Sequence, residues 1–153
     1  MKVFYLSFLL LLLACNNAGT TSTENITLTP ERINTINDLQ PGCYQMIIDK
    51  DSALFKVDIK GDSVFGNLVY NRFEKDDNTG AFTGRADSDK IIGWYRFQSE
   101  GMISVREVIF KIMGNQLAEA YGDISAMGDT AVFKYPHALN YEETHLYTKI
   151  NCN

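Results

Sequence analysis

The sequence lacks the features that mark several large functional classes. It has no basic run and no aromatic residues interleaved with lysine and arginine, and 14 basic against 19 acidic residues give a net charge of −5. Because nucleic-acid binding depends on neutralising phosphates, this composition argues against a nucleic-acid partner. A glycine-rich phosphate loop, a zinc motif and an internal repeat are also missing. We therefore predict no cofactor and no metal.

Histidine is scarce, with His137 and His145 as the two instances. Their spacing fits no tight metal motif, so both are interpreted as surface or loop residues. Ser104 has no histidine nearby in sequence and no nucleophile-elbow pattern around it. A hydrolase that uses Glu100, Ser104 and His137 would need these groups to converge in space. It is the third and least favoured hypothesis, and we predict no catalytic residues.

Long apolar runs are absent outside the N-terminus, which reads MKVFYLSFLLLLLACNN. The run over residues 3–13 is shorter than the roughly 20 residues of a membrane-spanning helix, and it follows a basic residue. Residues 1–14 are therefore predicted to be a signal peptide. The sequence Leu12-Leu13-Ala14-Cys15 resembles the bacterial lipoprotein cleavage box, which implies diacylglycerol on Cys15 and cleavage before it. The alternative is an ordinary secretory signal with an unrelated cysteine.

Several acyl chains anchor a protein stably to a membrane, whereas one chain does so marginally. Asn16 and Asn17 follow the lipid cysteine, where neither an aspartate nor an acidic cluster stands. An aspartate would resemble an inner-membrane retention signal, and an acidic cluster a surface-export signal. We predict a cell-envelope lipoprotein of the outer membrane that faces the periplasm and meets the membrane through its lipid.

Cysteine is also rare, and only Cys43 and Cys152 remain once Cys15 is lipidated. In an oxidising compartment two cysteines most simply form one disulfide. On the chain-entropy model, closing so long a loop is worth at most about 4 to 5 kcal/mol. A catalytic thiol or a metal pair is the competing interpretation, but neither cysteine has further ligands nearby in sequence.

Composition divides the mature chain into a tether and one domain. Residues 15–40 are predicted to be a lipid-anchored tether with a short helix, which starts at Thr29-Pro30 and carries Ile33, Ile36 and Leu39 on one face. Residues 41–153 are predicted to be a single all-β domain. They show short β-branched and aromatic runs separated by turn residues, with clean alternation in ALFKVDIK. The runs cover residues 43–49, 53–60, 63–73, 81–86, 90–98, 103–112, 116–122, 131–135 and 144–150.

Short turns favour antiparallel neighbours, so about eight or nine strands are expected to form a meander. It would be either a small lipocalin-like barrel or a strongly curled sheet. Glycines recur inside the runs, in VFGNL, FTGRA, IIGWY and AYGD. A glycine inside a strand has a packing cost, so the repetition indicates tight bends or close backbone approach.

The stretch SEGMISVREVIF gathers Glu100, Arg106 and Glu107. In a strand, Arg106 shares one face with Val108, Phe110 and Ile112, and Glu107 lies on the other. An ionic residue directed at the core needs a partner, which Glu100 would supply as a semi-buried ion pair. The functional alternative makes Arg106 a carboxylate or phosphate binder in a pocket beside Glu100 and Trp94.

Three short motifs, each an aspartate, a hydroxyl residue and a small or apolar residue, contain Ser52, Ser63 and Thr130. They resemble the O-glycosylation acceptor of exported proteins in the Bacteroidetes group. All three also fall where turns are expected, so modification is a hypothesis.

The motifs GCY, FEKDDNTGAFTG, IIGWYRFQSEG and SVREVIFKI, with the late Cys152, resemble small uncharacterised lipoproteins of Bacteroidetes-type bacteria. The resemblance implies location, disulfide and an all-β domain, but no activity. The first functional hypothesis is a non-enzymatic envelope protein that binds a small apolar or amphipathic ligand in its barrel. The second is a module with a packed interior that binds another envelope protein.

Overall fold

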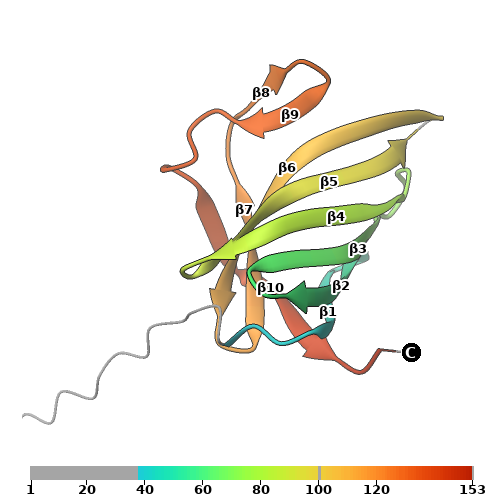
Figure 1. Ribbon diagram of the computed structural model, residues 1–153. Helices are drawn as coiled ribbons and strands as arrows, with labels where there is room; N and C mark the ends of the chain where they lie inside the picture. Colours follow the sequence, from blue (N-terminus) through green and yellow to red (C-terminus); the bar gives the residue numbers. More distant parts are fainter. Residues whose placement is uncertain (1–37, 100, 153) are drawn as a thin grey trace, which may run out of the picture. The chain divides into compact units, whose positions relative to one another are not determined.

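The computed structural model describes residues 38–99 and 101–152, in which there is no α-helix (Figure 1). Within them, no helix is long and apolar enough to cross a membrane. The strands are β1 (Gly42–Ile48), β2 (Asp51–Lys60), β3 (Ser63–Asn71), β4 (Asn78–Asp87), β5 (Lys90–Ser99), β6 (Met102–Met113), β7 (Gln116–Tyr121), β8 (Ile124–Met127), β9 (Thr130–Phe133) and β10 (Asn140–Ile150).

Eight of these strands close a barrel. Their order is β5, β4, β3, β2, β1, β10, β7 and β6, and β6 pairs back onto β5. All neighbours in this ring are antiparallel. The predicted all-β meander is confirmed, and of its two expected forms the structure shows the closed barrel.

The remaining strands, β8 and β9, form a hairpin. In the sequence this hairpin lies between β7 and β10, which pair with each other in the barrel. β6 pairs with β7 only from Phe110 to Met113. Toward its start β6 parts from β7 and meets β9 instead, in a parallel contact of Val105 with Thr130 and of Arg106 with Ala131. The hairpin therefore stands at the seam where β6 and β7 diverge.

The middle of the barrel is packed with aromatic side chains. The predicted alternation in β2 is confirmed, because Ala53, Phe55 and Val57 are buried. The ring of Phe55 lies 5.0 Å, centroid to centroid, from those of both Phe82 and Phe110. Burial of such rings is a large part of the hydrophobic stabilisation of a small domain. This part of the interior is a core and leaves no room for a ligand.

The glycines inside β4 and β5 make space for this core. Gly84 and Gly93 lie opposite each other on the two strands. A Cβ atom on Gly93 would lie 2.5 Å from Cζ of the Phe82 ring and 2.6 Å from the Thr83 carbonyl oxygen. The close approach predicted for strand-interior glycines is confirmed here, because any larger residue would displace the ring or the backbone.

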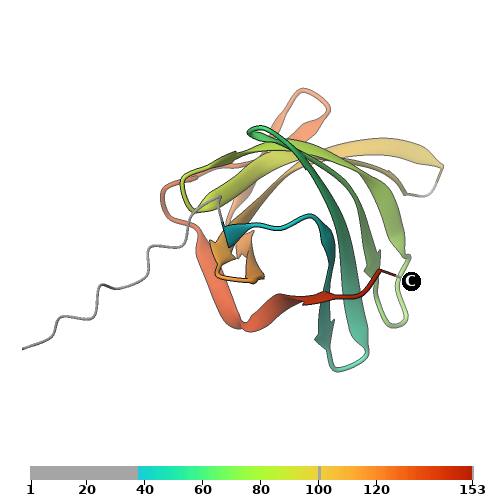
Figure 2. The same cartoon turned by 60° about the horizontal axis from the view of Figure 1, so that its bottom comes forward.

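The end of the barrel at which β1 begins is closed by the chain that precedes it. Leu39 is 4% exposed and belongs to the core. The Tyr44 hydroxyl donates a hydrogen bond to the carbonyl oxygen of Gln40, 2.7 Å away. Figure 2, which brings the bottom forward, shows this segment crossing the barrel as it enters β1. The predicted tether, its helix except for the last residues, the signal peptide and Cys15 lie outside the described residues.

The predicted disulfide is confirmed, because Cys43 is bonded to Cys152. Cys43 lies in β1, and Cys152 follows β10, the neighbouring strand. These two strands pair at only three positions, which makes their seam short. The disulfide thus fastens the first and last strands of the barrel together, as the sequence predicted.

Candidate functional site

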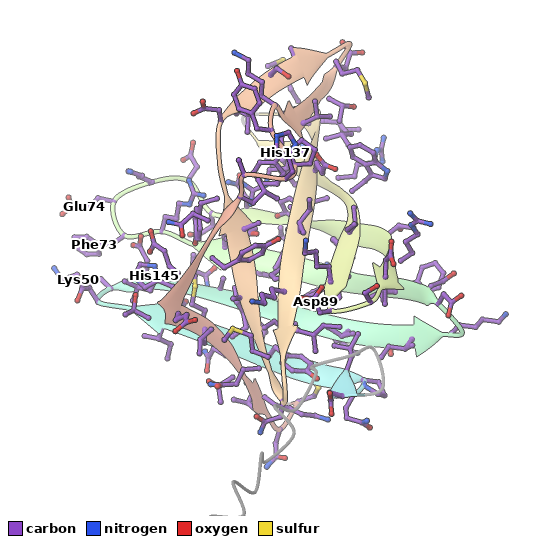
Figure 3. The ribbon with its side chains drawn as sticks, turned by 90° about the vertical axis from the view of Figure 1, so that its left-hand side faces the viewer. Lys50, Phe73, Glu74, Asp89, His137 and His145 are labelled. Carbon is purple, nitrogen blue, oxygen red and sulfur yellow. A yellow bond between two sulfur atoms is a disulfide. The ribbon has the colours of Figure 1, made fainter. Side chains whose placement is uncertain are left out.

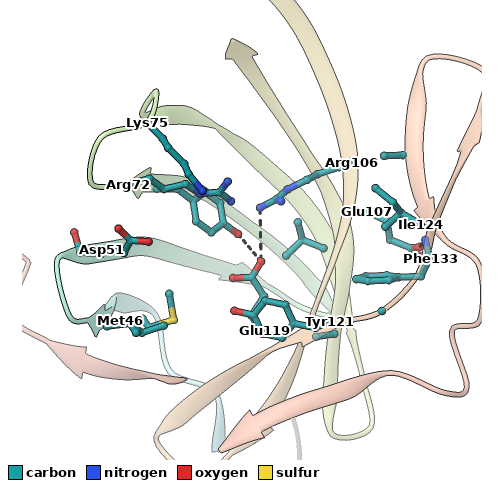
Figure 4. A pocket seen from close by; sticks show the side chains of 17 residues that line it. Met46, Asp51, Arg72, Lys75, Arg106, Glu107, Glu119, Tyr121, Ile124 and Phe133 are labelled. Atoms are coloured by element: carbon teal, nitrogen blue, oxygen red, sulfur yellow. Dashed lines mark hydrogen bonds and ion pairs between the residues drawn. The ribbon is translucent and has the colours of Figure 1, made fainter. Parts of the chain in front are cut away.

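A cavity of about 390 Å³ lies at the barrel end away from Leu39, where β6 and β7 diverge. Its walls come from the ends of β1, β3 and β7, the start of β6, and the β8–β9 hairpin (Figure 4). Its lining combines apolar side chains, among them Met46, Val108 and Phe133, with charged ones. Volumes of about 300 to 1,000 Å³ are typical of small-molecule sites, so this pocket is at the small end of that range.

Glu119 is the centre of a buried polar network in this pocket. The hydroxyl of Tyr70 donates to its Oε1 at 2.7 Å, and that of Tyr147 donates to its Oε2 at 2.6 Å. A nitrogen of the Arg106 guanidinium lies 3.6 Å from Oε1, and the Glu119 side chain is 9% exposed. Figure 4 marks the contacts of Glu119 with Tyr70 and Arg106. Each carboxylate oxygen is thereby supplied with a donor, as a buried charge requires.

The strand register explains why a carboxylate is directed inward here. Glu119 is paired with Phe110 at the last position that β7 shares with β6. Opposed residues of an antiparallel pair point to the same face, and Phe110 belongs to the core. Glu119 therefore also points into the barrel, at the level where the packed core gives way to the pocket.

The two tyrosines that donate to Glu119 are held in their neutral form. Burial and the neighbouring Glu119 charge raise the pKa of Tyr70 and Tyr147 well above the usual value. Desolvation disfavours the phenolate, and a carboxylate beside it repels a second negative charge. Both hydroxyls therefore keep their protons and remain donors at physiological pH.

Arg106 is held between the network and the pocket. Its guanidinium carbon lies 4.7 Å from the ring centroid of Tyr70 and 5.4 Å from that of Tyr95, within cation–π range. Burial opposes its charge, but the neighbouring Glu119 carboxylate favours it, and the pKa of Arg106 is raised. Its Nε atom is buried and has no hydrogen-bond partner among the described residues. That atom is closed off from solvent, but the Arg106 side chain as a whole is 31% exposed and lines the pocket.

The structure confirms that Arg106 shares its face with Val108, Phe110 and Ile112, all of which are in the core. Its observed ion-pair partner is Glu119, whereas the predicted partner Glu100 lies outside the described residues. Trp94 does not line the pocket. It is 43% exposed and faces outward opposite Glu107, whereas Tyr95 is opposite Arg106. Tyr95 therefore replaces Trp94 as the aromatic neighbour of Arg106.

Glu107 points away from Arg106 and holds the β8–β9 hairpin. Its Oε2 accepts a hydrogen bond from the backbone N–H of Phe133 at 2.9 Å. The Lys134 N–H donates to the Asp123 carbonyl oxygen at 2.8 Å and closes the base of the hairpin. Since Phe133 lines the pocket, as Glu107 itself does, this hydrogen bond positions one of the pocket walls.

Replacing Glu107 with alanine is expected to loosen this hairpin and leave the barrel intact. A hydrogen bond to a charged group contributes about 1.5 to 3 kcal/mol, so amide exchange at Phe133 should become roughly ten times faster or more. Glu107→Gln keeps an oxygen acceptor and is the matched control. Site-resolved hydrogen exchange measures the effect, and unchanged protection of Phe133 in Glu107→Ala would refute this role.

The other polar residues singled out from the sequence do not form a common site. Ser104 lies on β6 and lines a second, shallower hollow under β8–β9. No hydrogen bond joins it to His137 in the part of the chain described here. Figure 3 shows His137 beside the β8–β9 end and His145 well below it, and His145 is paired with Glu142. Among the described residues, no group of three or more His, Cys, Asp or Glu side chains could hold a metal.

The three candidate glycosylation residues lie within two residues of a turn. Ser52, Ser63 and Thr130 lie at the starts of β2, β3 and β9, and all three are half-buried. The Ser52 hydroxyl accepts a weak hydrogen bond from the side-chain amide of Asn71, at 3.4 Å. Modification of these residues stays a prediction.

The chain was compared with protein-family models, with curated proteins and with solved structures, and none of these matches it. The interpretation of the pocket therefore depends on its own chemistry.

Proposed function

We propose that this protein is a binding protein that holds one small amphipathic ligand in the open end of its barrel. The pocket is small and bounded by fixed strands, and it combines apolar walls with a few charged groups. This combination is typical of sites that bury the apolar part of a ligand and orient it through a polar end. We further propose that a lipid on Cys15 tethers the domain to the periplasmic side of the outer membrane.

One observation carries this proposal: Glu119 and the rings of Tyr70 and Tyr95 hold the Arg106 guanidinium at the pocket, and the Arg106 side chain, which lines the pocket, is still 31% exposed. A hydrogen bond to a charged group contributes about 1.5 to 3 kcal/mol. An acceptor on a bound ligand would gain such a bond from the accessible part of the guanidinium, and ligand binding would then stabilise the fold.

Native mass spectrometry of residues 16–153, exported to a periplasm, tests the proposal. We expect one additional non-covalent mass that is lost under denaturing conditions, at one copy per chain. A bare polypeptide, together with no stabilisation by any amphiphile tested, would overturn the binding function. The intact mass of the full-length, membrane-bound protein separately tests the lipid on Cys15 and the proposed glycosylation.

A second candidate function, a module for binding an envelope protein, is favoured by the exposed apolar residues of the hairpin. All four residues of β8 are exposed, with Ile124 at 66% and Met127 at 61%. Apolar side chains that gather on a surface commonly mark an interaction site. Substituting both with serine would weaken partner binding on this hypothesis, while native mass spectrometry would find the barrel empty.

A further inference from the structure

Three cationic side chains line one region of the pocket. Arg72 and Lys75 come from the segment that follows β3, and Arg106 comes from β6. Arg106 forms an ion pair with Glu119, as described above. Neither Arg72 nor Lys75 has a carboxylate within ion-pair distance in the described part of the chain. Two cations therefore stand at the pocket without an acidic partner, in a chain whose net charge is −5.

The carboxylates that line the pocket are already engaged. Asp51 accepts a hydrogen bond from the backbone N–H of Phe73 at 2.8 Å. Glu107 accepts from a backbone N–H of the hairpin, and Glu119 accepts from two tyrosines. The formal charges of the pocket lining balance, but the ion pairing does not. Arg72 and Lys75 have no ion-pair partner among the described residues, while each carboxylate already accepts at least one hydrogen bond, so the pocket has unused capacity for an anion.

The opposite wall is apolar. Ile124, Ala131 and Phe133 of the β8–β9 hairpin line it. Figure 4 shows Arg72 and Lys75 on one side of the pocket and Ile124 and Phe133 on the other, with Arg106 between them. The pocket is therefore polarised, and a ligand with two chemically different ends would bind in one orientation.

We propose that the ligand is an amphiphile with an anionic head group. Arg72 and Lys75 bind the head group beside the Arg106 charge, and the apolar part lies against the β8–β9 hairpin. This inference rests on the proposed function, because it names the ligand class of the same pocket. Carboxylate and phosphate share the chemistry that these cations recognise, so the test includes both.

Isothermal titration calorimetry with octanoate, octyl phosphate and octanol separates head-group recognition from apolar binding. We expect at least one of the two anions to bind residues 16–153 about tenfold or more tightly than octanol does. The double variant Arg72→Gln/Lys75→Gln should lose about tenfold in affinity for the anion and keep its affinity for octanol. Arg72 and Lys75 are exposed, so this variant is expected to fold, and retained octanol binding verifies it.

The matched control is Lys56→Gln/Arg96→Gln, which removes the same two charges from exposed positions outside the pocket. Its anion affinity should change by less than about twofold, because exposed charges at a distance are screened by salt. Equal binding of all three probes, or equal losses in the two double variants, would overturn the anionic head group and leave the binding function standing. Failure of all three probes to bind would overturn both proposals.

Discussion

Replacing Glu119 with alanine is expected to lower the free energy of unfolding by about 3 to 5 kcal/mol, the cost typical of breaking a buried ion pair. The substitution leaves the Arg106 charge, whose side chain is 31% exposed, without its carboxylate. It also removes the acceptor of two hydroxyls whose tyrosines, Tyr70 and Tyr147, are 5% and 0% exposed. Urea denaturation followed by circular dichroism measures the loss as a lower midpoint at unchanged slope.

A compensating variant separates this explanation from a simple loss of packing. Glu119→Leu/Arg106→Met removes both charges and fills similar volume, so it should be more stable than Glu119→Leu alone. If the double variant is the less stable of the two, the charge pair is not what makes Glu119 important. The single variant Glu119→Gln keeps one carbonyl acceptor and is expected to lie between the wild type and Glu119→Ala.

Loss of the disulfide is expected to destabilise the domain by about 2 to 5 kcal/mol. Cys43 and Cys152 are separated by 109 residues, so the bond restrains a very long loop in the unfolded chain. The seam that it fastens is short, because β1 and β10 pair at three positions. In the absence of the bond, this seam is the first place at which the barrel is expected to open.

The effect is measured on Cys43→Ser/Cys152→Ser by urea denaturation, with the wild type under oxidising and reducing conditions beside it. The reduced wild type should behave like the double variant, since both lack the same constraint. Equal midpoints for the oxidised protein and the double variant would show that the pairing of β1 with β10 holds the barrel closed unaided.

The barrel strands could be predicted because alternation and turn residues are local. The β2 run shows this most clearly, with Ala53, Phe55 and Val57 buried and Lys56 exposed. β8 was missed, since its residues are few and all exposed and thus carry no alternation. β10 begins at Asn140, earlier than predicted, and a bulge between Tyr141 and Leu146 interrupts its pattern. Local signals fail where a strand has no buried face.

The site was predicted in part. The alternation of residues correctly predicted that Arg106 points inward and needs an acidic partner. Because Glu100 is nearer in the sequence, it was predicted as that partner instead of Glu119. Glu119 is brought to Arg106 by the pairing of β6 with β7, and Tyr70 is 49 residues from Glu119 in the chain. One signal was available: in QLAEAY a single carboxylate shares its face with Leu117, which predicts a charge directed at the core. The tyrosine donors follow from barrel closure, which no local pattern encodes.

The most direct test of a ligand pocket at the open end of the barrel is a nuclear magnetic resonance titration of isotope-labelled residues 16–153, first with octanoate and then with octyl phosphate. We expect saturable amide shifts at the pocket, around Met46, Tyr70 and Phe133, and unchanged signals at the closed end around Leu39. Shifts confined to the outside of the β8–β9 hairpin, or no saturable shift at all, would contradict a binding site inside the barrel.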